Sequence, residues 1–357
     1  MTNAIPKKMR ALVLDRYEAD LVDAIGGLKL VERPVPSPGR GEVLVRVEAA
    51  PCNPSDLLLL QGRYGTLKTL PATPGWEGAG RVAASGGGWI ARYLLGKRVA
   101  CGVPGDRDGT WAEYVVAGAG ECIPLRRDVP MEQAASLIVN PLTAVGLLET
   151  ARSRGHRAAV QTAAASQLGR MLVAMARESR YPLLNVVRRE DQVELLQSLG
   201  AEHVLNSSEE DFTERLRDAC DRLRATIAFE AVAGEMTGTL LHCMPPGSMV
   251  YVYGALSHEA CANIHPVDLI FREKTVAGFF LGSWLRRRGP LGTLRLARRV
   301  QRMLADGRIA TAIQRRLTLE QAVEGLLRYV DRMTDGKVLI CPHKRSSDLV
   351  VGKSAAS

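Results

Sequence analysis

The chain has 357 residues, of which 46% are hydrophobic and 24% charged, and its formal net charge is +9. This length predicts two domains, and the composition is typical of a folded globular protein. No apolar run approaches the roughly 18 residues that a membrane-spanning helix needs, and residues 1–10 lack the apolar core of a signal peptide. We therefore expect a cytoplasmic protein with no membrane partner.

Arginine accounts for much of the basic excess and is concentrated in two places, Arg286–Arg288 and Arg295–Arg302. No base-stacking aromatic side chains alternate with these arginines, so we expect solvated surface and no nucleic-acid partner. A positive surface also favours anionic ligands such as nucleotide phosphates and acyl thioesters. The seven cysteines are odd in number, scattered and without a Cys-x-x-Cys pair, which predicts a reducing compartment and no disulfide framework.

The first part of the chain, residues 9–135, has the pattern of a small, distorted β-barrel. Val43–Ala49 alternates apolar and polar side chains in the manner of a half-buried strand. Frequent Gly, Pro and Asp residues separate the other apolar runs. We predict that residues 1–135 form one domain, with further strands at Gly80–Ala83, Arg98–Cys101 and Trp111–Val116.

After about Met131, apolar strands and helices alternate, which predicts a parallel sheet covered by helices on both faces. We expect residues 136–305 to form this doubly wound domain. Residues 306–343 would return to the first domain through a strand at Lys337–Ile340, and residues 344–357 would form a flexible tail. The predicted strands are Ala158–Gln161, Leu183–Val187, His203–Asn206, Thr226–Glu230, Met249–Tyr253 and Thr275–Phe280, and the predicted helices are Glu132–Leu137, Thr143–Ala151, Leu168–Glu178, Asp191–Leu199, Glu209–Leu223 and Gly234–Cys243.

The turn between the first strand and the first helix of this alternating pattern is rich in small residues. Residues 161–169 read Gln-Thr-Ala-Ala-Ala-Ser-Gln-Leu-Gly. Small residues let backbone N–H groups approach a pyrophosphate at the helix N-terminus, and a glycine lets helix and strand pack closely. An alanine-rich turn without a cofactor is the alternative, and Gln167 stands where many such turns have glycine. The candidate cofactor-binding residues of this turn are Ala165, Ser166, Gln167, Leu168 and Gly169.

Two arginines follow the second strand of the alternating pattern. Arg188 and Arg189 lie about 20 residues after the small-residue turn, where an NAD-binding domain usually has an acidic residue for the ribose hydroxyls. A guanidinium can pair with a 2′-phosphate, which a carboxylate would repel. The pair therefore favours NADPH over NADH, and a surface arginine pair at a helix start is the alternative.

The segment 74–80 reads Pro-Gly-Trp-Glu-Gly-Ala-Gly and resembles the Pro-Gly-His-Glu-Gly-Ala-Gly signature of zinc alcohol dehydrogenases. Trp76 stands at the position of the zinc-binding histidine, and an indole offers a metal no lone pair because its N–H only donates. The zinc-ligand cysteine segment is matched by Asn53-Pro54-Ser55-Asp56, with Cys52 one place early. Glu77 alone does not supply the three protein ligands of a catalytic zinc site, so we predict no metal.

On these residues the chain resembles the zinc-independent medium-chain dehydrogenases/reductases. Within them it is most similar to the quinone oxidoreductases and the mitochondrial-type 2-enoyl thioester reductases, over roughly residues 10–342. The resemblance implies a GroES-like distorted β-barrel catalytic domain and a Rossmann domain that binds NADPH. The segments that carry it are Asn53–Asp56, Gln61–Gly65, Gly109–Glu113, Val139–Ala144, Ser198–Val204 and Gly278–Trp284.

The resemblance also implies roles for individual residues. Tyr64 matches the tyrosine that enoyl thioester reductases use as the acid, and a pocket residue without that role is the alternative. Asn140 and Thr143 match cofactor contacts, with a helix cap as the alternative for Asn140. Lys337 matches a cofactor-binding lysine, with a plain surface lysine as the alternative. The remaining implied cofactor contacts are Asn53, Tyr253, Gly254, Ala255, Leu256, Phe279, Phe280, Leu281 and Gly282.

Three functions remain open from the sequence. The first is an NADPH-dependent reductase of activated carbon–carbon double bonds in enoyl thioesters, enals or enones, with Tyr64 as proton donor. The second is an NADPH:quinone oxidoreductase, in which no specific acid is essential. The third is a non-catalytic NADPH-binding protein. The resemblance further implies a homodimer in which the strand near Thr275–Phe280 pairs across the interface.

Overall fold

The computed structural model describes residues 4–344, which form two compact units. The first unit comprises the residues up to Val139 and those from Leu294 onward, and the second comprises Asn140–Thr293. The chain passes between the units within two helices, α5 (Val139–Ser153) and α11 (Leu281–Ala305). The sequence-based domain limits at residues 135/136 and 305/306 differ from these unit boundaries by 4 and 12 residues. The predicted flexibility of residues 345–357 lies outside the described residues.

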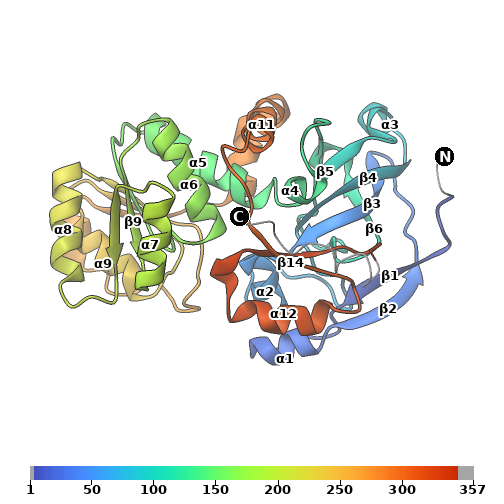
Figure 1. The fold of residues 1–357 in the computed structure, drawn as a ribbon, viewed down its shortest axis with the longest axis horizontal. Coiled ribbons are helices and arrows are strands. Elements are labelled where there is room, and N and C mark those ends of the chain that lie inside the picture. Colours follow the sequence, from blue (N-terminus) through green and yellow to red (C-terminus); the bar gives the residue numbers. More distant parts are fainter. Residues whose placement is uncertain (1–3, 345–357) are drawn as a thin grey trace, which may run out of the picture. The chain divides into compact units, whose positions relative to one another are not determined.

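The first unit is built on a seven-stranded sheet (Figure 1) in the order β14-β15-β3-β4-β5-β7, with β6 also paired to β3. The long strand β3 (Glu42–Pro51) pairs antiparallel with β4, β6 and β15, so it connects the N-terminal strands to the returning C-terminal segment. A separate hairpin joins β1 (Lys8–Val13) to β2 (Lys29–Pro34). The other strands are β4 (Glu77–Ser85), β5 (Arg98–Gly102), β6 (Tyr114–Gly118), β7 (Cys122–Pro124), β14 (Ile313–Leu317) and β15 (Lys337–Ile340).

The first unit also has several short helices, of which only α4 overlaps a helix predicted from the sequence, at Glu132–Leu137. The helix α2 begins at Pro54, where proline is favoured because the first helical N–H needs no partner. A buried apolar cluster that includes Leu57, Trp111, Val115 and Ile340 packs these helices against the sheet. The helices are α1 (Leu21–Gly26), α2 (Pro54–Leu60), α3 (Trp89–Leu94), α4 (Met131–Ala135) and α12 (Ala322–Val330), with single 3-10 turns at Ala119–Glu121 and Met333–Asp335.

The second unit contains the predicted parallel sheet. Its six strands lie in the order β10-β9-β8-β11-β12-β13 and all pair in parallel. The strands are β8 (Ala159–Gln161), β9 (Leu183–Val187), β10 (His203–Asn206), β11 (Ile227–Glu230), β12 (Met249–Val252) and β13 (Thr275–Gly278), and the helices are α5, α6 (Gln167–Glu178), α7 (Glu190–Ser198), α8 (Phe212–Leu223), α9 (Glu235–Cys243), α10 (Pro266–Ile270) and α11.

The strand order of this sheet reverses between β8 and β11. Strands β9 and β10 are added on one side of β8, whereas β11, β12 and β13 follow on the other. Open parallel sheets bind ligands outside the carboxyl ends of the strands at such a point. The predicted fold class, a β-rich domain with a doubly wound parallel sheet, is confirmed.

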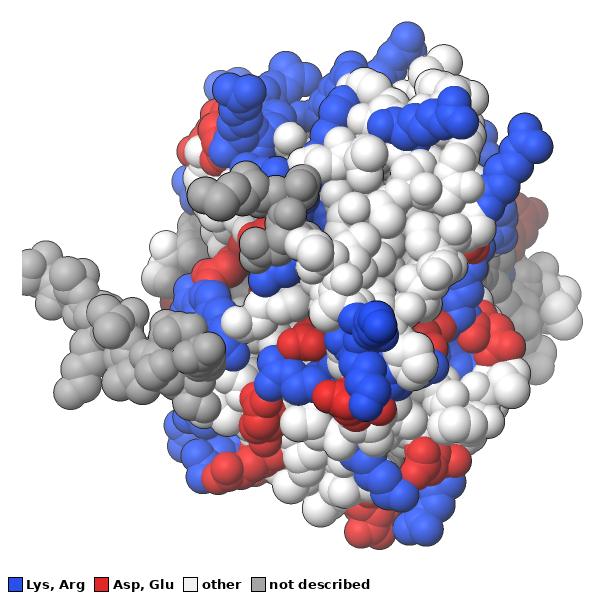
Figure 2. Space-filling view, turned by 90° about the vertical axis from the view of Figure 1, so that its right-hand side faces the viewer, with Lys and Arg blue, Asp and Glu red and all other residues white. Residues whose placement is uncertain are grey.

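The basic excess of the sequence lies on exposed surface. Lys and Arg side chains gather at the upper end of the face in Figure 2, and acidic side chains mix with basic ones lower down. On α11, Arg295, Arg298 and Arg302 are all exposed at helical spacing. This confirms the expectation of a solvated helix face. The helix is interrupted at Gly289, which has a φ of 74°, directly before Pro290.

None of the seven cysteines forms a disulfide, as predicted. Six of them are buried, and Cys261 is exposed. Burial raises the thiol pKa of each of the six, which are Cys52, Cys101, Cys122, Cys220, Cys243 and Cys341.

Candidate active site

A buried carboxylate organises the residues around the N-terminus of α2. The two oxygens of Asp56 accept hydrogen bonds from the backbone N–H groups of Asn53 at 2.7 Å and of Trp76 at 3.0 Å. Burial raises the pKa of Asp56 to about 7, although these two bonds and the charge of Lys337 act in the opposite direction. Asp56 therefore fixes the backbone of Trp76 next to the start of α2.

Lys337, Asn53 and Glu77 form a buried hydrogen-bonded chain in the first unit. The Lys337 ammonium donates to the side-chain oxygen of Asn53 at 2.6 Å and to the carbonyl of Cys52 at 3.0 Å. The Asn53 amide donates to Glu77 at 3.0 Å. The other Glu77 oxygen accepts from the backbone N–H groups of residues 138 and 139, both at 2.9 Å.

These hydrogen bonds of Lys337 decide one alternative that the sequence left open. Lys337 is 3% exposed, so the interpretation as a plain surface lysine is wrong. Burial lowers the pKa of Lys337, while the nearby acidic groups act to raise it. The two hydrogen bonds of the ammonium, to Asn53 and Cys52, point to a structural function within the first unit, and the role of Lys337 in cofactor binding stays a prediction.

Tyr64 packs against the tryptophan that stands in the histidine position. The ring centroids of Tyr64 and Trp76 are 4.8 Å apart, at an angle of 38°. The Trp76 indole N–H donates to the carbonyl of Ser55 at 3.1 Å, and the Lys68 ammonium lies 4.6 Å from the centroid of the Trp76 ring. Trp76 is thus held at both its backbone and its indole nitrogen, and it orients Tyr64.

Tyr64 carries a half-buried phenol. Burial, and then the charge of Asp56, raise the pKa of Tyr64 above its usual value of 10.0, so the phenol is a weaker acid than a free tyrosine. The hydroxyl makes no hydrogen bond to any of residues 4–344. It therefore remains available to a carbonyl oxygen of a substrate.

In the second unit, the small-residue turn lies at the predicted place, between β8 and α6. Ser166 caps α6 because its hydroxyl accepts from the backbone N–H of Gly169 at 3.1 Å. A Cβ atom added to Gly169 would lie 2.3 Å from the carbonyl oxygen of Ala164, so only glycine allows this contact between the turn and the helix. Gln167 and Leu168 are buried in the first turn of α6, and Ala163 has a left-handed φ of 49°.

Sequence reasoning missed two polar residues that connect the carboxyl ends of β8 and β11. Glu230 accepts from the Thr162 hydroxyl at 3.0 Å and from the backbone N–H groups of Val232 and Ala233, both at 2.7 Å. The Thr162 hydroxyl oxygen also accepts from the Ala231 N–H at 2.8 Å. In the sequence, the position of Glu230 at the end of an apolar strand was the feature that could have predicted this hydrogen bond.

The two arginines after β9 differ in their partners. Arg189 pairs with Asp191 through two hydrogen bonds of 3.0 and 3.3 Å. Arg188 is exposed, and its guanidinium makes no ion pair or hydrogen bond with the described part of the chain; only its backbone N–H is bonded, to Gln192. Arg188 is therefore the member of the pair that can bind an added phosphate.

Three further predicted cofactor residues present polar groups without a protein partner. Asn140 and Thr143 are 7% and 6% exposed on α5, and neither side chain is hydrogen-bonded to another described residue. The helix starts at Val139, so Asn140 is not its cap and that alternative is wrong. The Tyr253 hydroxyl is buried and likewise has no partner among residues 4–344.

The other predicted residues of the second unit follow β12 and β13. Gly254 lies so close to Ala231 that an added Cβ would be 2.8 Å from its carbonyl oxygen, and the Leu256 N–H donates to the same carbonyl at 3.0 Å. Phe279 is buried after β13, whereas Phe280 is 56% exposed. Ala255 belongs to the loop after β12, and Leu281 and Gly282 open α11.

The predicted site residues thus fall into two groups, each within one unit. Asn53, Tyr64 and Lys337 lie in the first unit around Trp76 and Asp56. The remaining cofactor candidates lie in the second unit, on α5, in the loops that follow strands β8, β9, β12 and β13, or at the starts of α6 and α11. Among residues 4–344, no three His, Cys, Asp or Glu side chains lie close enough together to hold a metal ion.

Comparisons with known proteins follow this division. The alcohol dehydrogenase GroES-like domain matches residues 39–127, and the zinc-binding dehydrogenase model matches residues 168–296. The mitochondrial enoyl-[acyl-carrier-protein] reductase of Bos taurus is 32% identical over 294 residues, covering 81% of this chain and 76% of that protein. The chain belongs to the medium-chain dehydrogenase/reductase superfamily.

Solved structures of the superfamily agree with this assignment. A putative NADPH:quinone reductase from Mesorhizobium loti is 34% identical, with a TM-score of 0.89, and the match covers 95% of this chain and all of that one. A mycobacterial protein solved with NADPH is 23% identical and shares the fold, with a TM-score of 0.79 over 94% of this chain and 100% of its own. This chain is an NAD(P)H-dependent oxidoreductase of the superfamily. No helix within residues 4–344 is long and apolar enough to cross a bilayer.

Proposed function

We propose that this medium-chain reductase uses NADPH to reduce carbon–carbon double bonds conjugated to a carbonyl, as in enoyl thioesters, enals and enones. The observation that carries the proposal is the pair of Tyr64 and Trp76. A tryptophan fixed by Asp56 and Ser55 stands where zinc members have a metal ligand, and it supports a protonated phenol with a free hydroxyl.

The second unit fits the cofactor. Glycine is required at Gly169, and the turn that precedes it is small enough for a pyrophosphate to approach the N-terminus of α6. Asn140, Thr143 and Tyr253 offer polar groups without protein partners, and Arg188 offers an unpaired guanidinium for a 2′-phosphate. NADPH, when bound, supplies the hydride.

The residues of the first unit then stabilise the negative charge that develops on the substrate and supply a proton. Reduction at the β carbon places negative charge on the carbonyl oxygen and on the α carbon of the substrate. The Tyr64 hydroxyl donates a hydrogen bond to that oxygen and then gives up its proton, an effect of about 10²–10⁴-fold for a well-placed acid. Trp76 and Lys68 hold the ring of Tyr64 and its surroundings in place.

The test is the substitution Tyr64→Phe, with Tyr93→Phe as the matched control because Tyr93 is 59% exposed on α3. We expect kcat for a trans-2-enoyl thioester to fall more than about tenfold in Tyr64→Phe, with the NADPH dissociation constant unchanged. Tyr93→Phe should match the unsubstituted protein. An unchanged kcat in Tyr64→Phe would reject the acid role.

Quinone reduction is the second candidate, and the similarity to the Mesorhizobium loti protein favours it. A quinone accepts hydride without help from a specific acid. The turnover number for quinones should therefore be nearly the same in Tyr64→Phe as in the unsubstituted protein. Comparing NADPH oxidation with trans-2-enoyl thioesters, enones and quinones, each with both tyrosine variants, separates the two functions.

We also propose a homodimer that pairs through β13. This strand is an edge of the six-stranded sheet, so one row of its backbone groups is unpaired within the described chain. Beside it in sequence, Ile270 and Phe271 are 66% and 77% exposed, which is unusual for large apolar side chains. Pairing with a second copy would hydrogen-bond the free edge of β13 and remove Ile270 and Phe271 from water.

A cytoplasmic location stays a prediction. It rests on the scattered, unpaired cysteines of the chain. The name of the bovine relative places that protein in the mitochondrion.

A further inference from the structure

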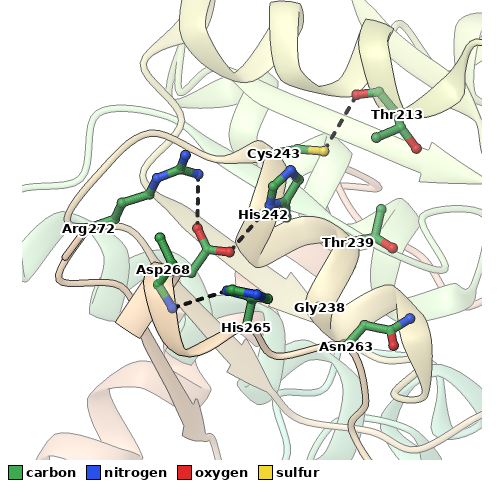
Figure 3. A pocket seen from close by; sticks show the side chains of 10 residues that line it. Thr213, Gly238, Thr239, His242, Cys243, Asn263, His265, Asp268 and Arg272 are labelled. Carbon is green, nitrogen blue, oxygen red and sulfur yellow. Dashed lines mark hydrogen bonds and ion pairs between the residues drawn. The ribbon is translucent and has the colours of Figure 1, made fainter. Parts of the chain in front are cut away.

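The second unit contains a cavity of about 430 Å³ that is separate from the predicted cofactor residues (Figure 3). Its walls come from α8, from the second half of α9 and from the segment 263–272, which includes α10. None of the residues assigned to the cofactor lines it. The cavity therefore needs an explanation of its own.

One wall of the cavity depends on a glycine. The segment 262–263 runs directly against α9, so a Cβ atom added to Gly238 would lie 2.2 Å from the carbonyl oxygen of Asn263 and 2.5 Å from that of Ala262. Asn263 itself has a left-handed φ of 57°. The wall is thus set by close backbone packing, and this packing places the Asn263 side chain at the cavity.

Among the described residues that line the cavity, Asp268 is the one carboxylate, and nitrogen atoms of three side chains lie close to its oxygens. Figure 3 shows Asp268 between Arg272 and His242, and the Asp268 oxygens lie 3.2 Å from the Arg272 guanidinium and 3.4 Å from Nδ1 of His242. The buried Lys274 ammonium lies 3.0 Å from the same carboxylate. Burial acts to raise the pKa of Asp268, but its hydrogen bond to Lys274 and its other partners lower it overall, so the group stays ionised.

The local charge is positive despite this carboxylate. Arg272 and Lys274 carry two fixed charges against the single charge of Asp268. Arg217 on α8 adds to the positive potential: the pKa of the lining thiol Cys243 is raised by burial, but the charges of Arg217 and Lys274 act to lower it. An anion that enters the cavity would therefore meet a favourable potential.

Several hydrogen-bond donors around the cavity are not used by the protein. The backbone N–H of Val267 donates to Nδ1 of His265 at 3.2 Å, so a neutral His265 ring carries its proton on Nε2, which is left free. Arg272 uses one terminal nitrogen for Asp268, and its remaining N–H groups have no partner among residues 4–344. The Asn263 amide and the Thr213 hydroxyl are likewise without a described partner.

We infer that this cavity binds a small organic anion through a carboxylate or phosphate group. The anionic group is received by the guanidinium of Arg272 and by Nε2–H of His265, whereas the Asn263 amide, which Figure 3 shows at the other end of the lining, is left for a polar group elsewhere on the ligand. The rest of the ligand packs against Val267, Gly238 and Cys243, which supply an apolar part of the wall. A bidentate contact from the planar guanidinium suits both anionic groups.

The test titrates the NADPH-saturated protein, so that the cofactor site is already filled. Sodium phosphate and sodium malonate are compared with sodium chloride at matched ionic strength, and binding is followed by calorimetry and by the thermal midpoint. We expect saturable 1:1 binding of phosphate, malonate or both, and whichever binds identifies the preferred anionic group. The proposal is overturned if neither anion binds beyond the effect of chloride.

Variants connect that binding to the cavity. Arg272→Gln should lower the affinity for the anion at least about tenfold, and Arg272→Lys should restore part of that affinity. Arg222→Gln is the control, because Arg222 is an exposed arginine of α8 outside the lining, and this variant should bind the anion unchanged. Thr239→Met, which narrows the cavity without removing a charge, should also weaken binding if Arg272→Gln proves unstable. Equal affinity in all four variants would show that the anion binds elsewhere. Turnover without the anion should be unchanged in every variant, so this test is independent of the role proposed for Tyr64.

Discussion

Lys337 donates a hydrogen bond of 2.6 Å to the side chain of Asn53, although the two residues are 284 positions apart in the chain. The contact joins the returning strand β15 to the start of α2, next to the antiparallel pairing of β15 with β3. Asp56 and Glu77 are both buried close enough to influence the ammonium of Lys337. The first unit therefore concentrates one base and two acids where water cannot solvate them.

The free energy of unfolding should depend on pH in a way that reflects the burial of Asp56. The pKa of Asp56 is raised from 3.8 in an unfolded chain to about 7 in the folded protein. Unfolding then releases a proton between these values, so the contribution of Asp56 disfavours folding above pH 7 and vanishes below about pH 4. Lowering the pH through this window should stabilise the protein relative to Asp56→Asn.

Urea denaturation of both proteins at several pH values measures that difference. The free energy of unfolding of the unsubstituted protein, minus that of Asp56→Asn, should rise as the pH falls from about 7 to 4. Taking the difference removes the carboxylates that do not interact with Asp56, whereas Glu77 and Lys337, which do, contribute to the measured difference. A difference that stays constant with pH would contradict the raised pKa.

Gly169→Ala should impair both folding and cofactor binding. The added methyl group would lie 2.3 Å from the backbone oxygen of Ala164, where no flexible side chain can move aside. We expect a loss of about 1–3 kcal/mol in the free energy of unfolding and weaker NADPH binding. Gly26→Ala is the matched control, because Gly26 is also helical and has nothing within 4 Å of the added atom. That variant should be neutral or slightly more stable.

Arg188→Gln should lower the affinity for NADPH without changing the affinity for NADH. The unpaired guanidinium of Arg188 is available to a 2′-phosphate, and loss of such a contact is expected to cost at least about tenfold in affinity. Arg189→Gln serves as the control, because Arg189 is paired with Asp191. Fluorescence titration of each variant with NADPH and with NADH gives four dissociation constants, each of which is compared with that of the unsubstituted protein. An equal loss for NADPH and NADH in Arg188→Gln would reject the selectivity role.

Phe271→Asp should convert a dimer into monomers. Phe271 is the more exposed of two large apolar residues near the edge strand β13, and a carboxylate there would have to be buried in the proposed interface. Sedimentation or light scattering measures the change in mass. Trp89→Asp is the control, since Trp89 is 80% exposed but lies on α3 of the first unit. A native protein that is already monomeric, or a dimer unaffected by Phe271→Asp, would remove this interface from consideration.

The sequence predicted the second unit well because buried parallel strands have a simple pattern. Leu183–Val187 and His203–Asn206 were predicted with the bounds that the structure has, and the other strands differ by one or two residues at an end. In the first unit, the strand predicted at Trp111–Val116 begins instead at Tyr114, because Trp111 is a buried loop residue whose indole donates to the carbonyl of Pro51. The hairpin β1–β2 and the short helices other than α4 were missed, since a helix of one or two turns is stabilised mainly by tertiary contacts.

The candidate site was predictable only where a local motif defines it. The turn before Gly169 and the substitution of histidine by Trp76 can be recognised in a few consecutive residues. The burial of Lys337 depends on contacts with residues 284 positions away, and the link between Thr162 and Glu230 depends on the order of strands in the sheet. No local pattern contains that information. The roles of Tyr64, Arg188 and the other proposed ligands stay predictions.

The uneven exposure of the cysteines makes the protein easy to label at one place. Six thiols are buried with raised pKa values, so a maleimide dye would react mainly at Cys261. Cys261 precedes by two positions the asparagine at the wall of the anion cavity. A fluorophore attached there would report occupancy of that cavity in the otherwise unaltered protein, and would allow its ligands to be screened optically.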